Sequence, residues 1–463
     1  MASPADYLTT LADLVARTGR ATLPASTVAA ARAVVLDTIG AMLAGSQLPE
    51  NSRLARLMSE RSPGGPATLI GHDAATEPMF AALVNATSGV GFEVDEGNRW
   101  GGGHPAIHVL PAVLAVAEER GTSGRALIQA LVAGYEVTSR IGGAAQLRPN
   151  VHSHGTWGTP GAAAGVATLL GRGSIRAIIS LAASMSPANS WTPCFESATI
   201  RNAYPGRSAM QGILAVHLHD CGYTGLADGP SDVYGTLLAE RFDPDRVVEG
   251  IGPDGRVERY RIEQNYFKLH ACCLYNHPTL DALDALQAAA PFRAEEVERV
   301  EATSIPFTAR MAGWYPSGML SAKFSIPYAV AARLVSGRSD PAAFLEPVIA
   351  DERVRALAAR VTVATDPAMS MQRSDPPQAR VRVVLRDGRV LERATTVVRG
   401  DAANPAPPEA LLAKFHALAA PVVGAAGADR IARAVEGLDA LADVRALTAV
   451  LGAGARALMA SRR

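Results

Sequence analysis

Residues 92–111 read FEVDEGNRWGGGHPAIHVLP and come directly before an apolar helical run. The polar side chains of this stretch are Glu93, Asp95, Glu96, Asn98, Arg99, His104 and His108. Glu93 and Asp95 are two residues apart and share a face if the segment is extended, and His104 precedes Pro105, which is well tolerated in a first helical turn. With three consecutive glycines between them, these groups suit proton transfer beside a loop that can wrap a small ligand. A solvated acidic loop, with His104 near a helix cap, is the alternative.

The composition is that of an enzyme-sized globular protein. The chain has 463 residues, of which 48% are hydrophobic and 19% charged, so it can bury a large core and form two or three domains. A net charge of +0 and the lack of a dense basic run argue against a nucleic-acid partner. Neither a signal-type N-terminus nor about 18 uninterrupted apolar residues is found, so we expect a cytoplasmic protein without a membrane partner.

Cysteine and lysine usage are both informative. The four cysteines fit neither a CxxC pair nor a disulfide framework, and the adjacent Cys272 and Cys273 are most simply buried small side chains. Of 44 basic residues only Lys268, Lys323 and Lys414 are lysine. Because arginine is otherwise used throughout, each lysine invites a reason specific to a compact, titratable ammonium.

The periodicity predicts a mainly α protein in three parts. Residues 1–265 have helical apolar spacing, clearest at 27–45, 111–120, 123–141 and 160–170, which predicts an Ala-rich helical bundle. Residues 266–400 alternate in the strand manner at 297–303, 361–365, 379–385 and 390–398, with helical stretches at 278–289 and 321–334. We therefore expect a large helical domain, an inserted α+β lid, and a helical return over 401–463 after the proline-rich 401–410.

Several familiar motifs are absent or incomplete. GIGPDG at 250–255 matches GxGxxG but contains Pro253 and precedes no helix, so a turn is expected there. The pairs His104/His108 and His152/His154 complete no zinc ligand set by spacing, and no serine lies in a GxSxG elbow. We expect no metal site and no serine hydrolase.

Stretches along nearly the whole chain resemble the MmgE/PrpD family, which includes 2-methylcitrate dehydratase, cis-aconitate decarboxylase and iminodisuccinate epimerase. The similar stretches are VVLDTIGAMLAG (34–45), ATLIG (67–71), HPAIHVLPAVLAVAEE (104–119), HSHGTWGTPGAAAG (152–165), YPGRSAMQGILAVHL (204–218), KLHACCLYNHPTLDAL (268–283), SAKFSIPYAVA (321–331) and NPAPPEALLAKF (404–415). The KLHACC…HP stretch is the most specific of them. All three lysines fall inside these stretches.

The resemblance implies a large helical domain with a smaller α+β lid, a homodimer, no metal or organic cofactor, and a small di- or tricarboxylate substrate. The family's cleft positions correspond to Glu93, Asp95, His104, His152 and Lys268, with His277 the less certain member. This chain departs from many members at Glu96-Gly97, at Arg201 in place of lysine and at Tyr204 in place of histidine. Arginine can grip a carboxylate bidentately but cannot serve as a titratable acid.

These residues can be assigned different roles in a reaction. His104 and His152 would move protons, and Glu93 or Asp95 would orient a histidine or act as a second acid or base. Lys268 and Arg201 would anchor carboxylates and stabilise an enolate-like transition state, with Asn98, His277 and Tyr204 as further substrate contacts. Dehydration, decarboxylation and epimerisation all fit this set. A carboxylate-binding protein of the same fold without catalysis, in which these residues have structural roles, is the alternative from another class.

Overall fold

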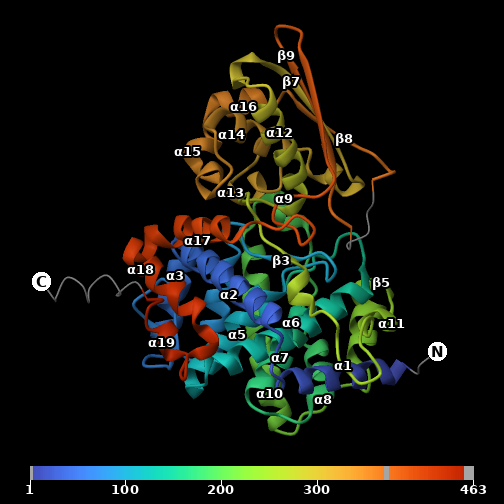
Figure 1. The fold of residues 1–463 in the computed structure, drawn as a ribbon, viewed down its shortest axis with the longest axis vertical. Coiled ribbons are helices and arrows are strands. Elements are labelled where there is room, and N and C mark those ends of the chain that lie inside the picture. Colours follow the sequence, from blue (N-terminus) through green and yellow to red (C-terminus); the bar gives the residue numbers. More distant parts are fainter. Residues whose placement is uncertain (1–3, 370–374, 453–463) are drawn as a thin grey trace, which may run out of the picture.

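The computed structural model describes residues 4–369 and 375–452, so the expected helical pattern over 453–463 lies outside the described residues. Figure 1 shows a large helical body with a smaller lobe of helices and strands above it. The mainly α character predicted from the sequence is therefore confirmed.

The body is a bundle of apolar helices that approach closely. Its main helices are α1 (Pro4–Thr18), α2 (Ala25–Ser46), α3 (Pro49–Arg61), α4 (Pro78–Gly89), α5 (Pro105–Arg120), α6 (Gly124–Ala144), α7 (Gly158–Leu169), α8 (Ile175–Ser184) and α10 (Ala203–Asp220). Helices α6 and α7 pack against each other, and a Cβ added to Gly161 would lie 1.7 Å from Thr138 Oγ1. Glycine at this contact lets the two backbones approach more closely than any side chain would allow.

Helix α2 is long and apolar enough to cross a membrane by length and composition alone. In the structure 61% of its most apolar window is buried, and it packs against α4, α5 and α17 (Pro408–Val423). Its apolar side chains thus contribute to the core of the body, as expected for a central helix of a bundle. Helices α17 and α18 (Ala425–Glu436) return the chain to the body after the smaller lobe.

Helix α5 begins earlier than the predicted stretch 111–120. It starts at Pro105 with His104 as its N-cap residue, and Pro111 lies inside it. Proline is accepted at the first position because the N–H group it lacks would have no helical partner there. The early start places His104 directly before the first turn of α5, at the end of the acidic stretch.

The smaller lobe contains a four-stranded sheet in the order β10-β9-β7-β8. The strands are β7 (Val297–Ser304), β8 (Val361–Thr365), β9 (Ala379–Leu385) and β10 (Val390–Thr395), and only β7 and β8 pair in parallel within this sheet. Gly388, with a φ of 88°, allows the tight turn between β9 and β10. Helices α12 (His277–Ala289), α14 (Ile326–Ser336) and α16 (Glu352–Ala358) complete the lobe, with α12 and α14 packed on the strands.

One predicted helix is interrupted. Residues 321–334 do not form a single helix, because α13 (Met319–Ala322) ends at Lys323 and α14 starts after Ser325. Ser325 Oγ accepts a hydrogen bond from the Tyr328 backbone N–H at 3.0 Å and caps the second helix. The interruption leaves Lys323 in a turn.

The 250–255 segment is a turn as predicted, closed by a hydrogen bond from Gly255 N to Gly252 O.

The described residues form two large hydrophobic cores and a third, smaller cluster around Leu69 and Val84. One joins the body helices to α17, α18 and the residues that follow them, and the other fills the smaller lobe between residues 271 and 385. Val94, Cys194 and Leu418 belong to the second core although they come from outside that range. The short strand β3 (Gly97–Asn98) also pairs with β6 (Asn265–Tyr266), which joins the acidic stretch to the entry of the smaller lobe.

Candidate active site

Residues 91–104, here called the acidic loop, connect α4 to α5 and are contacted by every lysine of the chain. Lys268 Nζ lies 2.9 Å from Glu93 Oε2, Lys323 Nζ donates to Gly91 O at 2.5 Å, and Lys414 Nζ donates to Val94 O at 2.7 Å. The three amino groups come from the lobe entry, the lobe interior and the C-terminal return, and burial lowers the pKa of Lys323 to about 7. A compact group with several N–H donors suits contacts with loop carbonyls and carboxylates. The scarcity of lysine therefore does point to this loop.

Glu93 is a buried carboxylate shared by two cations. It adopts a φ of 54°, an uncommon value for a residue other than glycine, so the segment is not simply extended as the spacing argument assumed. Arg201 pairs with one of its oxygens and Lys268 with the other. Burial opposes ionisation, but these two cations hold the pKa of Glu93 below its ordinary range. Glu93 is therefore an anion, and its charge balances those of Arg201 and Lys268, which were expected from the sequence to anchor substrate carboxylates.

Asp95 and His104 form the pair best suited to proton transfer. His104 Nδ1 donates to Glu96 O at 2.7 Å and lies 3.0 Å from Asp95 Oδ2, close enough for an ion pair. Lys268 Nζ is 3.6 Å from the other Asp95 oxygen. Despite burial, His104 and Lys268 keep the pKa of Asp95 well below its ordinary value. With its proton assigned to Nδ1 by these partners, His104 retains Nε2 for chemistry.

Glu96, one residue further on, behaves differently from Asp95. Burial raises its pKa to about 8, so it is largely uncharged at neutral pH. Its carboxyl group accepts from Ala106 N at 2.8 Å and from Tyr135 Oη at 3.0 Å. Glu96 therefore binds a backbone N–H in the first turn of α5 and holds the loop against α6.

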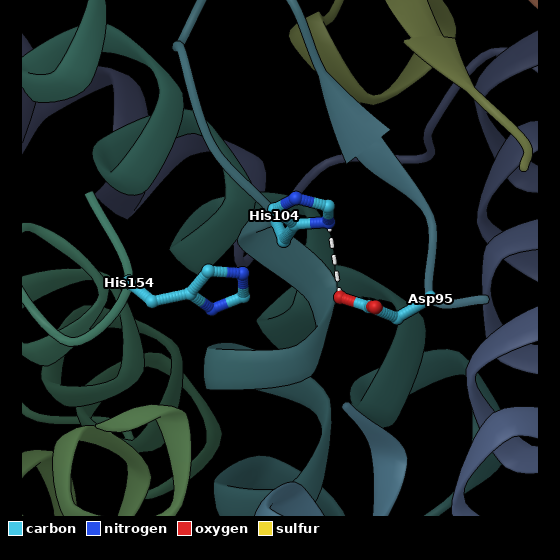
Figure 2. A group of neighbouring side chains, drawn as sticks. All are labelled: Asp95, His104 and His154. Carbon is cyan, nitrogen blue, oxygen red and sulfur yellow. Dashed lines mark ion pairs between the residues drawn. The ribbon is translucent and has the colours of Figure 1, made fainter. Parts of the chain in front are cut away.

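Four histidines lie together around the start of α5. The ring of His154 stacks on that of His104 with centroids 4.5 Å apart, and its centroid is 5.2 Å from that of His152 and 5.3 Å from that of His108. Figure 2 shows Asp95 and His104 of the acidic loop beside His154, which comes from the loop before α7. His108 is structural, since Nδ1 donates to His104 O and Nε2 accepts from Gly155 N, and burial lowers its pKa to about 4.

His152 and Tyr204 lie beside this cluster. His152 Nδ1 accepts from the backbone N–H of His154 at 3.0 Å, and its ring packs on Trp191 with centroids 3.9 Å apart. The Tyr204 ring meets His152 edge-on at 6.0 Å and also lines a surface cavity of about 490 Å³ together with Asn189 and other residues. Tyr204 is thus the predicted residue that links the histidines to an accessible hollow.

Two predicted substrate contacts have other partners in the structure. The amide of Asn98 donates to Arg261 O at 2.8 Å and accepts from Gly101 N at 2.8 Å, so it holds the glycine run in place. His277 Nε2 lies 3.2 Å from Cys272 O and its ring packs against His270, which places it inside the smaller lobe. The structure therefore brings together Glu93, Asp95, His104, His152, Lys268, Arg201 and Tyr204, while Asn98 and His277 have structural contacts.

A metal ion deserves consideration because donor atoms of Asp95, His104 and His154 all lie within 4.8 Å of one another. The charges nearby oppose a divalent cation. Lys268 lies against Asp95, and Arg201 is close enough to lower the pKa of His154. One carboxylate that is already paired with a cation and a histidine leaves little negative charge for a dication. The donor set fits proton transfer better.

His154 and Glu96 are the residues that sequence reasoning missed as part of the site. In the sequence, His154 belongs to an incomplete zinc motif and to the HSHGTWG stretch, and neither of these gives it a role; Glu96 likewise has no role assigned from the sequence. His154 can be recognised as a site residue only in the tertiary structure, where the loop before α7 packs against His104. No periodicity in the sequence indicates that contact.

Comparisons with known proteins identify the family of the chain. The model of the MmgE/PrpD N-terminal domain matches residues 9–237, and that of the MmgE/PrpD C-terminal domain matches residues 270–440. The chain is 24% identical over 462 residues to the cis-aconitate decarboxylase-like protein oryM of Aspergillus oryzae, covering 93% of this chain and 94% of that protein. It is 25% identical over 458 residues to the cis-aconitate decarboxylase of Aspergillus terreus, covering 93% and 92%. Two family domains that together span most of the chain show that this protein belongs to the MmgE/PrpD family.

Proposed function

We propose that this protein is a lyase that removes water or carbon dioxide from a small di- or tricarboxylate by acid/base catalysis, without a metal or organic cofactor. The family and the relatives described as cis-aconitate decarboxylases support a lyase of this type. Within the chain, the proposal is carried by His104, whose Nδ1 is held by Asp95 and Glu96 while Nε2 remains available.

Both reactions place negative charge next to a carboxylate. In dehydration a base removes a proton from the carbon beside a carboxylate, and the hydroxyl group leaves as water after it gains a proton. In decarboxylation the bond to one carboxylate breaks, carbon dioxide leaves, and the electron pair on carbon is captured by a proton. A histidine fixed through one nitrogen can take or give that proton with the other. Such proton transfer typically contributes about 100- to 10,000-fold.

The charge that develops requires cations held in place before the reaction. Lys268 and Arg201 are buried, and both are oriented by Glu93. Although burial disfavours its charge, Glu93 and Asp95 keep the pKa of Lys268 above its ordinary value, so it stays cationic. Arg201 Nε is buried and makes no hydrogen bond within residues 4–369 and 375–452, so it can donate to a substrate carboxylate. Fixed cations of this kind stabilise a transition state without reorganisation.

An epimerase or isomerase acting on an amino- or imino-dicarboxylate is the second candidate. It is favoured by the presence of two imidazoles, His104 and His152, in one cluster, because epimerisation needs one group to remove a proton and another to return it on the other face. The products distinguish the two classes, since epimerisation changes neither the mass nor the composition of the substrate.

The deciding experiment is a substrate screen of the purified protein. Hydroxy-, amino- and unsaturated di- and tricarboxylates are incubated in H₂O and in D₂O, and the products are identified by mass spectrometry and chiral separation. We expect loss of 18 or 44 mass units, from the departure of water or carbon dioxide, with deuterium incorporated after decarboxylation. Deuterium exchange without loss of mass would establish the epimerase instead, and no conversion of any compound would favour a binding protein.

A further inference from the structure

His154 has hydrogen-bonding capacity that the protein does not use. Its side chain is 1% exposed, and neither ring nitrogen makes a hydrogen bond with any residue that the structure describes. An unpaired buried polar group of this kind costs about 1–3 kcal/mol. Native proteins satisfy most such groups, so a persistent exception at a functional centre indicates a partner from outside the chain.

The neighbouring imidazole His108 shows that the fold can satisfy a histidine here when the role is structural. Both of its ring nitrogens have backbone partners, His104 O and Gly155 N. The main chain of His154 is itself well held, since its N–H donates to His152 Nδ1 and its carbonyl accepts from Asn189 Nδ2 at 2.7 Å. The backbone thus fixes the position of the ring while the ring nitrogens remain unused.

The position of the His154 ring points to the ligand bound at His104. Its ring lies nearly parallel to that of His104, with 21° between the planes, and the donor atoms of Asp95, His104 and His154 are mutually within 4.8 Å (Figure 2). Because the two ring centroids are 4.5 Å apart, a small molecule that meets Nε2 of His104 also lies near the ring of His154.

We propose that His154 contacts the substrate directly and donates a hydrogen bond from its ring N–H to a carboxylate oxygen of the molecule bound beside His104. The proposal rests on the carboxylate substrate proposed above and adds a contact residue to that site. Burial together with the charges of Arg201 and His104 holds the pKa of His154 well below the ordinary value. Its imidazole therefore stays neutral, with one donor and one acceptor, and does not exchange its role with His104.

The test compares two substitutions at this position. His154→Phe keeps an aromatic ring to stack on His104 but removes both nitrogens, whereas His154→Gln retains an amide donor. Binding of tricarballylate, a tricarboxylate without a hydroxyl group or double bond, is measured by isothermal titration calorimetry, with succinate as the dicarboxylate probe. We expect His154→Phe to weaken tricarballylate binding by about 10-fold or more and His154→Gln to recover most of the loss, the scale of a hydrogen bond to a charged group.

Thermal unfolding of the ligand-free variants separates a ligand contact from a structural role. We expect His154→Phe to be at least as stable as the wild type, because it removes buried polar atoms without partners, and the matched control His108→Phe to be less stable, because it leaves His104 O and Gly155 N unpaired. A lower unfolding temperature for His154→Phe than for His108→Phe would overturn the proposal.

Binding and turnover are read separately, so the two proposals can fail independently. Equal affinity of wild type and His154→Phe for the probes would overturn the role of His154 even if the substrate screen finds a lyase. A selective loss of affinity in His154→Phe would support it even if the screen finds no turnover. Failure of the wild type to bind either probe would also overturn it.

Discussion

Two clusters of histidine and aspartate side chains in this molecule contain the same kinds of residue but differ in how their donors and acceptors are used. The first is Asp95 and His104 with His154 at the acidic loop, and the second is His270 with Asp281 and Asp284 in the smaller lobe. In each group the donor atoms lie within 4.8 Å of one another. By residue type and spacing, both are candidates for a functional centre.

The second group is fully used by the fold. His270 Nδ1 lies 2.7 Å from Ser339 Oγ and Nε2 lies 3.1 Å from Asp281. Arg399 binds both aspartates, at 2.6 Å and 2.7 Å. Although burial opposes it, the hydrogen bond from His270 contributes to lowering the pKa of Asp281 to about 2. This group connects α12, which carries both aspartates, to Arg399 in the segment after β10, and so stabilises the lobe.

The first group has the same kinds of residue with part of its capacity unused. The ring nitrogens of His154 and Nε of Arg201 make no hydrogen bond in the described chain. The comparison teaches that residue identity does not separate a structural ion-pair network from a catalytic one. The satisfaction of donors and acceptors separates these two groups, because a buried polar group without a partner in the chain costs free energy unless another molecule binds it.

The largest expected effect is that of Lys268→Met at the first group. Removing the ammonium leaves Glu93 and Asp95 buried without a main partner, so we expect a loss of about 3–5 kcal/mol in the free energy of unfolding and about 100-fold or more in kcat/KM. Urea denaturation measures the first quantity. The control is Arg333→Met, which removes the ion pair between Arg333 and Asp284 of the second group. Because the Arg333 side chain is 23% exposed, we expect this substitution to lower the free energy of unfolding by about 1 kcal/mol or less. Equal losses would show that the two groups do not differ electrostatically.

His104→Ala should come next. We expect the protein to stay folded and kcat/KM, measured with the substrate found in the screen, to fall by about 100-fold or more, because the proton carrier is lost. His72→Ala, outside the cluster, should retain activity close to wild type. Near-normal turnover in His104→Ala would remove this residue from the mechanism.

His270→Ala tests the second group directly. It removes two hydrogen bonds inside the lobe, so we expect a loss of about 1–3 kcal/mol in the free energy of unfolding with little change in kcat/KM. The measurement pairs urea denaturation with turnover. If activity fell as much as in His104→Ala, the second group would belong to the active site, and the distinction between a structural and a catalytic group would be wrong.

The smallest expected effect is a pH dependence specific to the first group. Glu96 has a folded pKa of about 8 against an ordinary value of 4.5, so the stability that its protonated form contributes is present at acid pH and is lost as the pH rises through 8. Between pH 7 and pH 8 the wild type should lose about 1 kcal/mol relative to Glu96→Gln. Asp281 contributes no such change, because its lowered pKa confines its titration to acid pH. A constant difference between wild type and Glu96→Gln over this interval would contradict the assignment.

Much of the secondary structure follows from local patterns. Strands β8 and β9 match the predicted ranges 361–365 and 379–385. The prediction failed at residues 321–334, where the apolar period continues through a break. Ser325 caps a new helix there, and the turn before it carries Lys323, whose ammonium reaches the carbonyl of Gly91. That contact is more than 200 residues away in sequence and leaves no local signal.

The sequence by itself determined which residues could form the site. Its acidic loop, its three lysines and its histidines include most of the residues that the fold brings together, and the resemblance carried by its motifs identified the family. Only the tertiary structure decided how those residues are used. It assigned Asn98 and His108 to structural contacts, paired Arg201 and Lys268 through Glu93, and left the nitrogens of His154 without a hydrogen-bond partner among the described residues. The physical reason is that local patterns depend on chain geometry, whereas charge pairing and hydrogen-bond satisfaction depend on burial and on contacts between distant segments.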